Sequence, residues 1–523
     1  MDNVQSTKHY FITGRYTKRH TLCALILLLS AAACYGLCLR LVSQVHFHRA
    51  NNLFMKKAFK SALDELQRAD YYQPDDYKVK RGLAKTYYQI GALSRNTKQA
   101  FVWAQKAKDA ALKAFPLNPL DAETAFDLAR AEARLEQLYP YLYPQNKNNP
   151  YQALPYFKQA LSLRPNSVFY HYTFTQYLAW HHQEKELLSE VSSLARIYPE
   201  SYYYLRKEAF WSASVAEAVR QGLEQAIAAV ISIRDAHRAL SDLLAAAGKN
   251  AEALTHYQKF LGCNPFENST WNYIQLGRLY LKSNQTEKAE DSFTEALDLS
   301  PTKEKDLESI YNIYKHAGYP EELHSFLQKA SHRFMLSYRM DILTARSLID
   351  LKQLPQARTI LENLIRKDPV AEAHYWLART AEQEKDWDNM ELSIQKATVL
   401  EPANSHYHLL FSSALKRQGK LEGAEQEADR AIKHAAKPNP WLFNHRGWIR
   451  WNRQDFQGAL QDWQSAIQIE PQKAPFYAQA GAANQKLGQW AQALEYYQKA
   501  LRLDPENSAY KQKISALQSS KQY

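Results

Sequence analysis

The chain has 523 residues, with 66 Lys and Arg, 54 Asp and Glu, and a formal net charge of +12. Basic and acidic residues are interspersed, so this charge permits anionic partners without identifying one, and we expect no nucleic-acid partner. Only 15 residues are glycine, which argues against a sheet-rich fold with many tight turns and favours helices. The length would correspond to roughly three compact domains of about 150 residues each, unless the chain is an array of repeats.

The N-terminal segment combines a basic tail with an apolar run. Residues 1–20 contain four Lys or Arg and one Asp, and residues 21–42 are long and apolar enough to cross a bilayer as one helix. The positive-inside rule therefore predicts a cytoplasmic tail at 1–20 and places 43–523 outside the cytoplasm, in the periplasm of a bacterium with this chain in its inner membrane. Three lysines soon after the span weaken this topology: Lys56, Lys57 and Lys60.

Three fates of the apolar run stay open. A retained signal anchor is favoured, because the run is longer than a usual signal-peptide core and continues past any small-residue cleavage point. A cleaved signal peptide is the second. A lipoprotein is the third, if residues 30–34 are a lipobox, although the run continues after Cys34. Outside the run only Cys263 remains, which excludes a disulfide within the rest of the chain, and we expect it to be a small buried side chain.

A period near 34 residues extends through 43–507. The clearest unit spans 474–507, with small residues at its eighth, twentieth and twenty-seventh positions and a proline near its thirty-second: Gly481, Ala493, Ala500 and Pro505. This pattern resembles the tetratricopeptide repeat (TPR), in which small residues let two antiparallel helices approach closely. Further units begin at 270, 371, 405 and 440, and weaker ones near 43, 168, 234, 304 and 338.

The TPR resemblance covers about nine-tenths of the chain and implies an all-α fold. The expected architecture is a right-handed superhelical α-solenoid of TPR helix pairs, preceded by one transmembrane helix. We expect N-terminal TPR units at 43–201 with a loop insertion at 136–150, an irregular helical spacer at 202–233, a C-terminal TPR array at 234–507, and a cap helix and tail at 508–523.

In TPR proteins the first helix of each unit lines a concave groove through its second, fifth, ninth, twelfth and thirteenth positions, and the resemblance implies the same here. In the unit from 440 these positions carry Trp441, Asn444, Trp448, Trp451 and Asn452. Such a face suits a peptide or a sugar ring, with the amides as hydrogen-bond partners. The alternative is that the indoles pack against the cap or the neighbouring helix.

The same register predicts a mixed groove with a basic excess between 304 and 438. Its members include Asn312, Lys315, Arg346, Arg379, Lys416 and Arg417. An acidic peptide or an anionic glycan would suit this surface, and a solvated face without a ligand is the alternative. The full Lys/Asn/Arg carboxylate clamp of chaperone-binding TPR domains is not reproduced. The Tyr- and Pro-rich insertion at 136–150 is a third candidate surface, or else a lengthened packing loop.

The sequence contains no Gly-rich phosphate loop, no GxSxG motif and no HExxH motif. We therefore expect no catalytic residues, no bound metal and no cofactor. The resulting hypothesis is a membrane-anchored TPR scaffold for protein partners, which family analogy places in bacterial cell-envelope or polysaccharide assembly. Two alternatives stay open: a protein that binds a glycan or an anionic peptide in its groove, and a non-catalytic regulatory subunit of a membrane enzyme.

Overall fold

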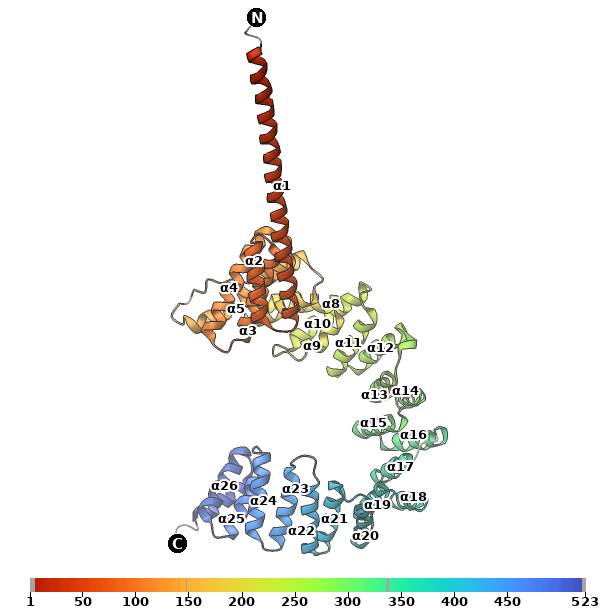
Figure 1. Ribbon diagram of the computed structural model, residues 1–523. Helices are drawn as coiled ribbons and strands as arrows, with labels where there is room; N and C mark the ends of the chain where they lie inside the picture. Colours follow the sequence, from red (N-terminus) through yellow and green to blue (C-terminus); the bar gives the residue numbers. More distant parts are fainter. Residues whose placement is uncertain (1–4, 147, 335–337, 520–523) are drawn as a thin grey trace. The chain divides into compact units, whose positions relative to one another are not determined.

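The computed structural model describes residues 5–146, 148–334 and 338–519 (Figure 1). All regular secondary structure in these residues is helical, in 27 α-helices and three 3₁₀ helices. Successive helices pack on one another in sequence order, which confirms the predicted all-α solenoid of helix pairs. The chain divides into two units, the N-terminal unit Met1–Asn264 and the C-terminal unit Pro265–Tyr523, which are described separately below.

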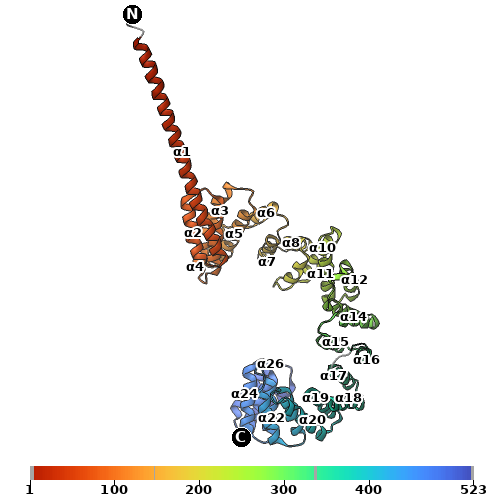
Figure 2. The same ribbon diagram turned by 45° about the vertical axis from the view of Figure 1, so that its right-hand side comes forward.

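The first helix, α1 (Gln5–Met55), has 51 residues. Within the described residues, its segment Ala24–Met55 is the one helix whose length and composition allow it to cross a membrane. Further along α1, the Ser43 side chain is buried and its hydroxyl donates a hydrogen bond to the Ala69 carbonyl of α2 (Phe59–Tyr72) at 2.9 Å. The helix that carries the apolar run thus continues without a break into the first helix pair, as both views show (Figure 2).

The rest of the N-terminal unit continues as a series of helices. They are α3 (Tyr77–Leu93), α4 (Thr97–Ala114), η1 (Phe115–Leu117), α5 (Ala122–Leu142), α6 (Leu154–Leu163), α7 (Val168–Trp180), α8 (Glu184–Ile197), η2 (Pro199–Ser201), α9 (Tyr202–Leu205), α10 (Ala213–Ala228), α11 (Ile233–Ala246) and α12 (Asn250–Cys263). Four of these helices begin at a side chain that accepts a hydrogen bond from the first turn: Asp76, Asn96, Asp121 and Ser212. Such N-caps satisfy backbone donors that have no partner inside the helix.

The expected insertion at 136–150 is partly helical, because α5 continues to Leu142. The segment after α5 folds back onto it: the Asn149 amide donates to the Glu136 carbonyl at 3.0 Å, and the Ala153 N–H donates to the Glu136 carboxylate at 2.7 Å. The ring of Tyr151 lies 5.9 Å from that of Phe101, centroid to centroid. The side chains at both ends of the insertion therefore pack against α4 and α5, whereas Tyr141 is 77% exposed.

The expected spacer at 202–233 contains the short α9 and the 16-residue α10. Helix α10 packs against α8 on one side and α11 on the other. Its close approach to α8 depends on Gly222, because a Cβ at this position would lie 2.2 Å from the Ser192 carbonyl oxygen. The turn into α11 passes through two residues with positive φ, Val230 at 61° and Ser232 at 41°.

The C-terminal unit begins with η3 (Pro265–Glu267) and continues as successive helix pairs. They are α13 (Thr270–Lys282), α14 (Thr286–Leu299), α15 (Lys303–Ala317), α16 (Pro320–Arg333), α17 (Tyr338–Asp350), α18 (Leu354–Lys367), α19 (Ala371–Glu384), α20 (Trp387–Leu400), α21 (Ser405–Arg417), α22 (Leu421–Lys433), α23 (Pro440–Asn452), α24 (Phe456–Ile469), α25 (Ala474–Lys486), α26 (Trp490–Leu503) and α27 (Ser508–Ser519).

Each of several pairs in this unit places a large ring of the second helix over a glycine of the first. A Cβ at Gly277 would lie 2.4 Å from the Phe293 ring, and one at Gly447 would lie 2.8 Å from Trp463 Nε1. Both rings are fully buried. The repeat spacing in the sequence therefore corresponds to a physical need for a missing side chain where the two helices cross.

The prediction that Cys263 is buried is wrong. Its thiol is exposed at the last residue of α12, where the adjoining turn leaves the side chain uncovered.

Candidate functional site

The predicted aromatic face lies on α23, but its three indoles differ in exposure. Trp441 is 54% exposed and Trp448 is 38% exposed. Trp451 is partly buried, with its ring 5.0 Å from Phe456 and 5.8 Å from Trp463, and it packs against the core between α24 and α25. Trp441 and Trp448 are thus available to a ligand, while Trp451 is largely a packing residue.

The two predicted amide side chains of this face also differ in their surroundings. The Asn444 side-chain oxygen accepts a hydrogen bond from Trp463 Nε1 at 3.2 Å, which satisfies the polar atom of a fully buried indole. Asn452 is exposed at the end of α23. Asn444 is therefore partly buried and paired with a core indole, whereas Asn452 lies at the surface.

Three of the predicted groove cations form ion pairs within the C-terminal unit. The Lys315 ammonium lies 2.9 Å from the Asp350 carboxylate, and the Arg379 guanidinium pairs with Glu382 one turn later. Arg346 lies 2.8 Å from the Glu308 carboxylate. The Lys315 and Arg346 pairs join neighbouring repeats, so these cations contribute to stacking of the units and offer less charge to a ligand.

Arg346 is the most enclosed of these cations. Its guanidinium carbon lies 4.3 Å from the centroid of the Tyr311 ring and 4.8 Å from that of Trp376, and its side chain is 14% exposed. Stacking between two rings fixes the guanidinium in place. Asn312, on the same helix as Tyr311, lines a shallow hollow of about 660 Å³ with Arg278 and Tyr319.

Lys416 and Arg417, at the end of α21, have no ion pair with a carboxylate among the described residues. Arg417 lies with its guanidinium carbon 5.5 Å from the Trp387 ring. Burial, and then the charge of Arg417, lowers the pKa of Lys416. On the next first helix, burial and the charge of Lys416 lower the pKa of His445 to about 4, so His445 is neutral at pH 7. Arg417 and the exposed indoles of α23, together with the partly buried Lys416, form the accessible part of the predicted surface.

A hollow in the N-terminal unit was not among the predicted sites. It has a volume of about 360 Å³ and lies between α3, α5 and α7, with Tyr88, Arg130, Arg134 and Trp180 in its lining. The Arg130 guanidinium carbon lies 3.9 Å from the Tyr88 ring centroid, and burial raises the pKa of the neighbouring Asp127 to about 6. The four-residue spacing of the two arginines on α5 was the sequence signal for this surface.

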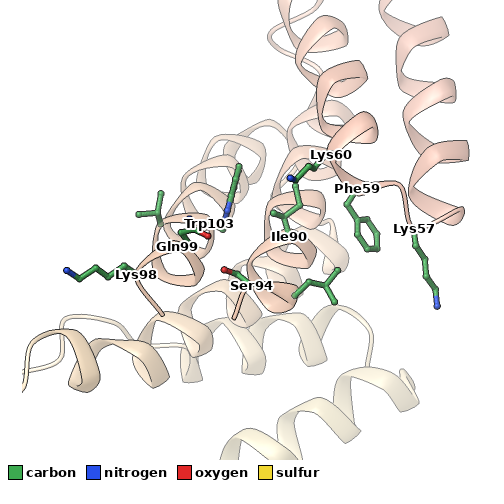
Figure 3. Close-up of a pocket in the computed structure, with 10 residues that line it drawn as sticks. Lys57, Phe59, Lys60, Ile90, Ser94, Lys98, Gln99 and Trp103 are labelled. Carbon is green, nitrogen blue, oxygen red and sulfur yellow. The ribbon is translucent and has the colours of Figure 1, made fainter. Parts of the chain in front are cut away.

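A second cavity in the N-terminal unit lies between α2, α3 and α4 and has a volume of about 720 Å³ (Figure 3). We call it the basic cavity. Its lining consists of Lys57, Phe59, Lys60, Ile90, Leu93, Ser94, Lys98, Gln99, Val102 and Trp103. The groove register did not identify it, because these residues lie on second helices, on the turns that lead into them and on the last turn of α3, past the register positions.

The described residues contain no group of three or more His, Cys, Asp or Glu side chains that could hold a metal ion. His181 is partly buried, and its Nε2 lies 2.9 Å from the Glu136 carboxylate. This pair lies at the junction of α5 and α7 and stabilises it.

Three stretches of the chain match models of the tetratricopeptide repeat: 272–303, 342–405 and 474–507. The chain is 20% identical over 214 residues to the TPR repeat-containing protein YpiA of Bacillus subtilis, an overlap of 41% of this chain and 50% of that protein. It is 29% identical over 120 residues to heat shock protein STI1 of Saccharomyces cerevisiae, covering 22% of this chain and 20% of that protein. The chain spans half or less of the length of the curated relatives that it matches.

Solved structures of repeat proteins also resemble the chain at low identity. Yeast Tom70 is 14% identical, over 92% of this chain and 95% of that chain, with a TM-score of 0.35. YrrB, described as a TPR protein with an unusual peptide-binding site, is 17% identical over 35% of this chain and 95% of that chain, with a TM-score of 0.32. No residue role follows from either likeness.

Proposed function

We propose, from the premise that the chain contains tetratricopeptide repeats, that it is a membrane-anchored scaffold that holds protein partners outside the cytoplasm. The repeats and the repeat proteins that it resembles support a scaffold for protein–protein interaction. The membrane location, its sidedness and a role in cell-envelope or polysaccharide assembly are the narrower parts of the proposal.

The continuity of α1 is the observation that carries the membrane part. The side chains from Leu25 to Leu29 are 54–68% exposed, so the described residues leave them uncovered. A lipid core would bury this surface, and each buried apolar side chain contributes roughly 1.5–3 kcal/mol. Because α1 enters the first helix pair at Ser43, the anchor and the first repeat form one continuous element.

Extraction of membranes with alkaline carbonate tests the anchor. The full chain should stay in the membrane pellet, and Leu27→Arg with Leu28→Arg should release it. Leu120→Arg with Val399→Arg is the matched control, because both side chains are exposed in the repeat region, by 79% and 74%. Release of the unmodified chain by carbonate would contradict the anchor. An alkaline phosphatase fusion at the C-terminus tests sidedness, and an inactive fusion on a stably produced chain would place the repeats in the cytoplasm.

The partner-binding part of the proposal centres on the surface made by Lys416, Arg417, Trp441 and Trp448. Lys416 and Arg417 have no carboxylate partner among the described residues, and Trp441 and Trp448 are exposed on the first helix of the next pair. Cations and exposed indoles on successive first helices suit an acidic segment of a protein with aromatic or aliphatic side chains. Aromatic side chains are also enriched where interfaces bind most strongly.

A photoreactive residue in place of Asn452, which is exposed beside this surface, tests it in intact cells. Protein adducts should form, and Lys416→Glu with Arg417→Glu should reduce them. Lys385→Glu with Lys433→Glu is the charge-matched control. Adducts that persist in the Lys416 and Arg417 variant would contradict this site. Quenching of tryptophan fluorescence by a soluble glycan, lost in Trp448→Ala, would favour the glycan alternative instead.

A further inference from the structure

The basic cavity in the N-terminal unit combines an apolar floor with a rim of cations. Ile90 and Trp103 form its inner surface, and Leu93 and Val102 remain 68% and 48% exposed at its edge. Lys57 and Lys98 extend at opposite ends of the cavity, and Lys60 lies above Ile90 between them (Figure 3). A surface of this kind can bury an apolar side chain while cations surround it.

The packing beneath the cavity is built for a close approach of α3 and α4. A Cβ at Gly91 would lie 2.9 Å from Trp103 Cβ and 3.3 Å from the Ala100 carbonyl oxygen. The Trp103 ring stacks on Tyr87, with centroids 5.7 Å apart, and the Lys106 ammonium lies 4.8 Å from the Trp103 ring. The indole is therefore held in a fixed orientation at the cavity wall.

The three lysines of the cavity have no carboxylate partner among the described residues, unlike other cations of the same unit. Lys80 lies 2.7 Å from Asp70, Arg81 lies 3.1 Å from Asp121, and Lys108 lies 2.7 Å from Glu132. Ion pairing is thus common in this unit, and the cavity is a place where it is missing. Its three cations therefore have no direct ion-pair partner, which favours a positive field in the cavity.

The composition of the flanking segments explains that field. Residues 3–63 contain no Asp or Glu, and neither do residues 77–108, which carry eight Lys or Arg. These two segments supply every residue that lines the cavity. In addition, α2 and α4 both begin at the cavity, and helix N-termini carry a partial positive charge.

We propose that the basic cavity is a second binding site, which takes an acidic peptide segment with a bulky apolar side chain from a protein partner. The apolar side chain enters between Ile90 and Trp103, and the carboxylates of the segment pair with Lys57, Lys60 and Lys98. The site lies on α2, α4, the turns that lead into them and the last turn of α3, apart from the first-helix positions of the expected groove. It rests on the proposed scaffold function only in that the ligand is a protein segment.

The position of the cavity along the chain disfavours lipid as the occupant. Helix α1 rises about 1.5 Å per residue, so the 13 residues from Val42 to Met55 place the start of α2 about 20 Å beyond the proposed membrane boundary. Lipid headgroups therefore do not reach the three lysines, whereas a peptide of a neighbouring protein can. A lipid could also supply a negative charge and an apolar group, and the crosslinking experiment below distinguishes a bound lipid from a bound peptide.

Fluorescence polarisation on the detergent-solubilised full chain tests the proposal with three labelled 12-residue peptides. The first is rich in Asp and Glu with two central leucines, the second has serine in place of the leucines, and the third has lysine in place of the acids. The first should bind at least tenfold more tightly than either of the others, and its affinity should fall as salt screens the charges. Equal affinity for all three, or no binding of the first, would overturn the proposal.

Variants then locate the binding. Lys57→Glu with Lys60→Glu and Lys98→Glu should weaken binding of the first peptide at least tenfold, as should Val102→Asp. Lys158→Glu with Lys185→Glu and Lys207→Glu is the matched control, since these three lysines are also exposed in the N-terminal unit and have no carboxylate partner within the described chain. Equal losses in the two triple variants would contradict a site at the cavity. Circular dichroism of each variant checks that the helices are retained.

A final measurement separates peptide from lipid and this site from the scaffold surface. The full chain with a photoreactive residue at position 102 is placed in vesicles of phosphatidylethanolamine and phosphatidylglycerol, and the first peptide is added. A peptide adduct is expected, and a lipid adduct alone would overturn the proposal. Lys416→Glu with Arg417→Glu should leave the yield of this adduct unchanged. Loss of the adduct at position 102 would therefore contradict binding at the cavity, whereas loss of crosslinking at position 452 concerns the scaffold surface.

Discussion

The Nδ1 atoms of His237 and His256 lie 2.9 Å apart across α11 and α12. In three other helix pairs the same separation of 19 residues joins a histidine of the first helix to a glutamate of the second: His46 to Glu65, His171 to Glu190 and His408 to Glu427. A histidine pair can form this hydrogen bond only if one ring donates and the other accepts, which requires at least one of them to be neutral. The pair of α11 and α12 therefore differs from the other three in the chemistry of this contact.

Acid should destabilise the N-terminal unit through this histidine pair. Burial, then the charges of His256 and Lys259, lowers the pKa of His237 to about 4, and burial also lowers the pKa of His256, against Glu224 and Glu252. An unfolded histidine has a pKa of about 6.5, so the unfolded chain binds more protons between pH 6.5 and 4. Stability from this pair is present above pH 6.5 and should fall as the pH drops through that window.

His256→Glu should reverse this behaviour by copying the pairing of the other units. A carboxylate beside His237 favours the charged imidazole, so the stabilisation should be present below pH 6.5 and lost as the pH rises above the new, raised pKa. Thermal unfolding from pH 5 to pH 8 measures the change. His332→Glu, at an exposed position of α16, is the control and should leave the pH profile as it is. A His256→Glu profile that still falls in acid would contradict the assigned pairing.

Gly222→Ala should destabilise the N-terminal unit by about 1–3 kcal/mol. The new Cβ would lie 2.2 Å from the Ser192 carbonyl oxygen, and since this atom belongs to the backbone of α8, α10 must move away from α8. Gly262→Ala is the matched control, because nothing lies within 4 Å of its Cβ position in α12. Alanine there should raise stability by about 0.5 kcal/mol through helix propensity. Urea unfolding compares the two, and equal effects would contradict the close approach.

Asp462→Asn should destabilise the C-terminal unit by about 3 kcal/mol. The side chain of Asp462 is 2% exposed and lies between two guanidinium groups, with its carboxylate 3.1 Å from both Arg446 Nε and Arg450 Nη1. Burial raises the pKa of this carboxyl group even beside Arg446, which is the cost of placing charge there. Loss of the charge leaves two partly buried arginines without their central partner.

Asp429→Asn is the control for that measurement. Asp429 also pairs with Arg446, at 2.6 Å, but its side chain is 50% exposed, so its loss should cost less than about 1 kcal/mol. Chemical denaturation of both variants gives the comparison. Similar losses of unfolding free energy in the two variants would show that burial of Asp462 does not determine its contribution to stability.

The helix pairs could be predicted because their spacing reflects contacts inside one repeat. Gly277 lies under Phe293 and Gly447 under Trp463 within the same unit, so the residues that need each other fall at fixed distances in the sequence. Pairing of the groove cations depends instead on contacts between repeats. Lys315 was predicted as a groove cation, but only the structure places its ammonium on Asp350 of the next unit.

The basic cavity escaped prediction for a different reason. Its apolar residues and lysines come from the turns between paired helices, where residues from α2, α3 and α4 meet, and no repeat position describes that junction. The signal in the sequence was the lack of Asp and Glu in 3–63 and 77–108. This lack of acidic residues indicates a binding site only once folding brings the two segments together.

Trp451→Ala and Trp448→Ala should separate packing from binding on one helix face. Trp451 packs on the core of α24 and α25, so its loss should destabilise the C-terminal unit by about 2 kcal/mol, less than a fully buried tryptophan would. Trp448 is 38% exposed, so its loss should cost less than about 1 kcal/mol but should reduce capture of a partner at the Lys416 and Arg417 surface. Thermal unfolding and photocrosslinking at position 452 measure the two effects. If Trp448→Ala left crosslinking unchanged while Trp451→Ala abolished it without loss of stability, the assignment of Trp448 to binding and Trp451 to packing would be reversed.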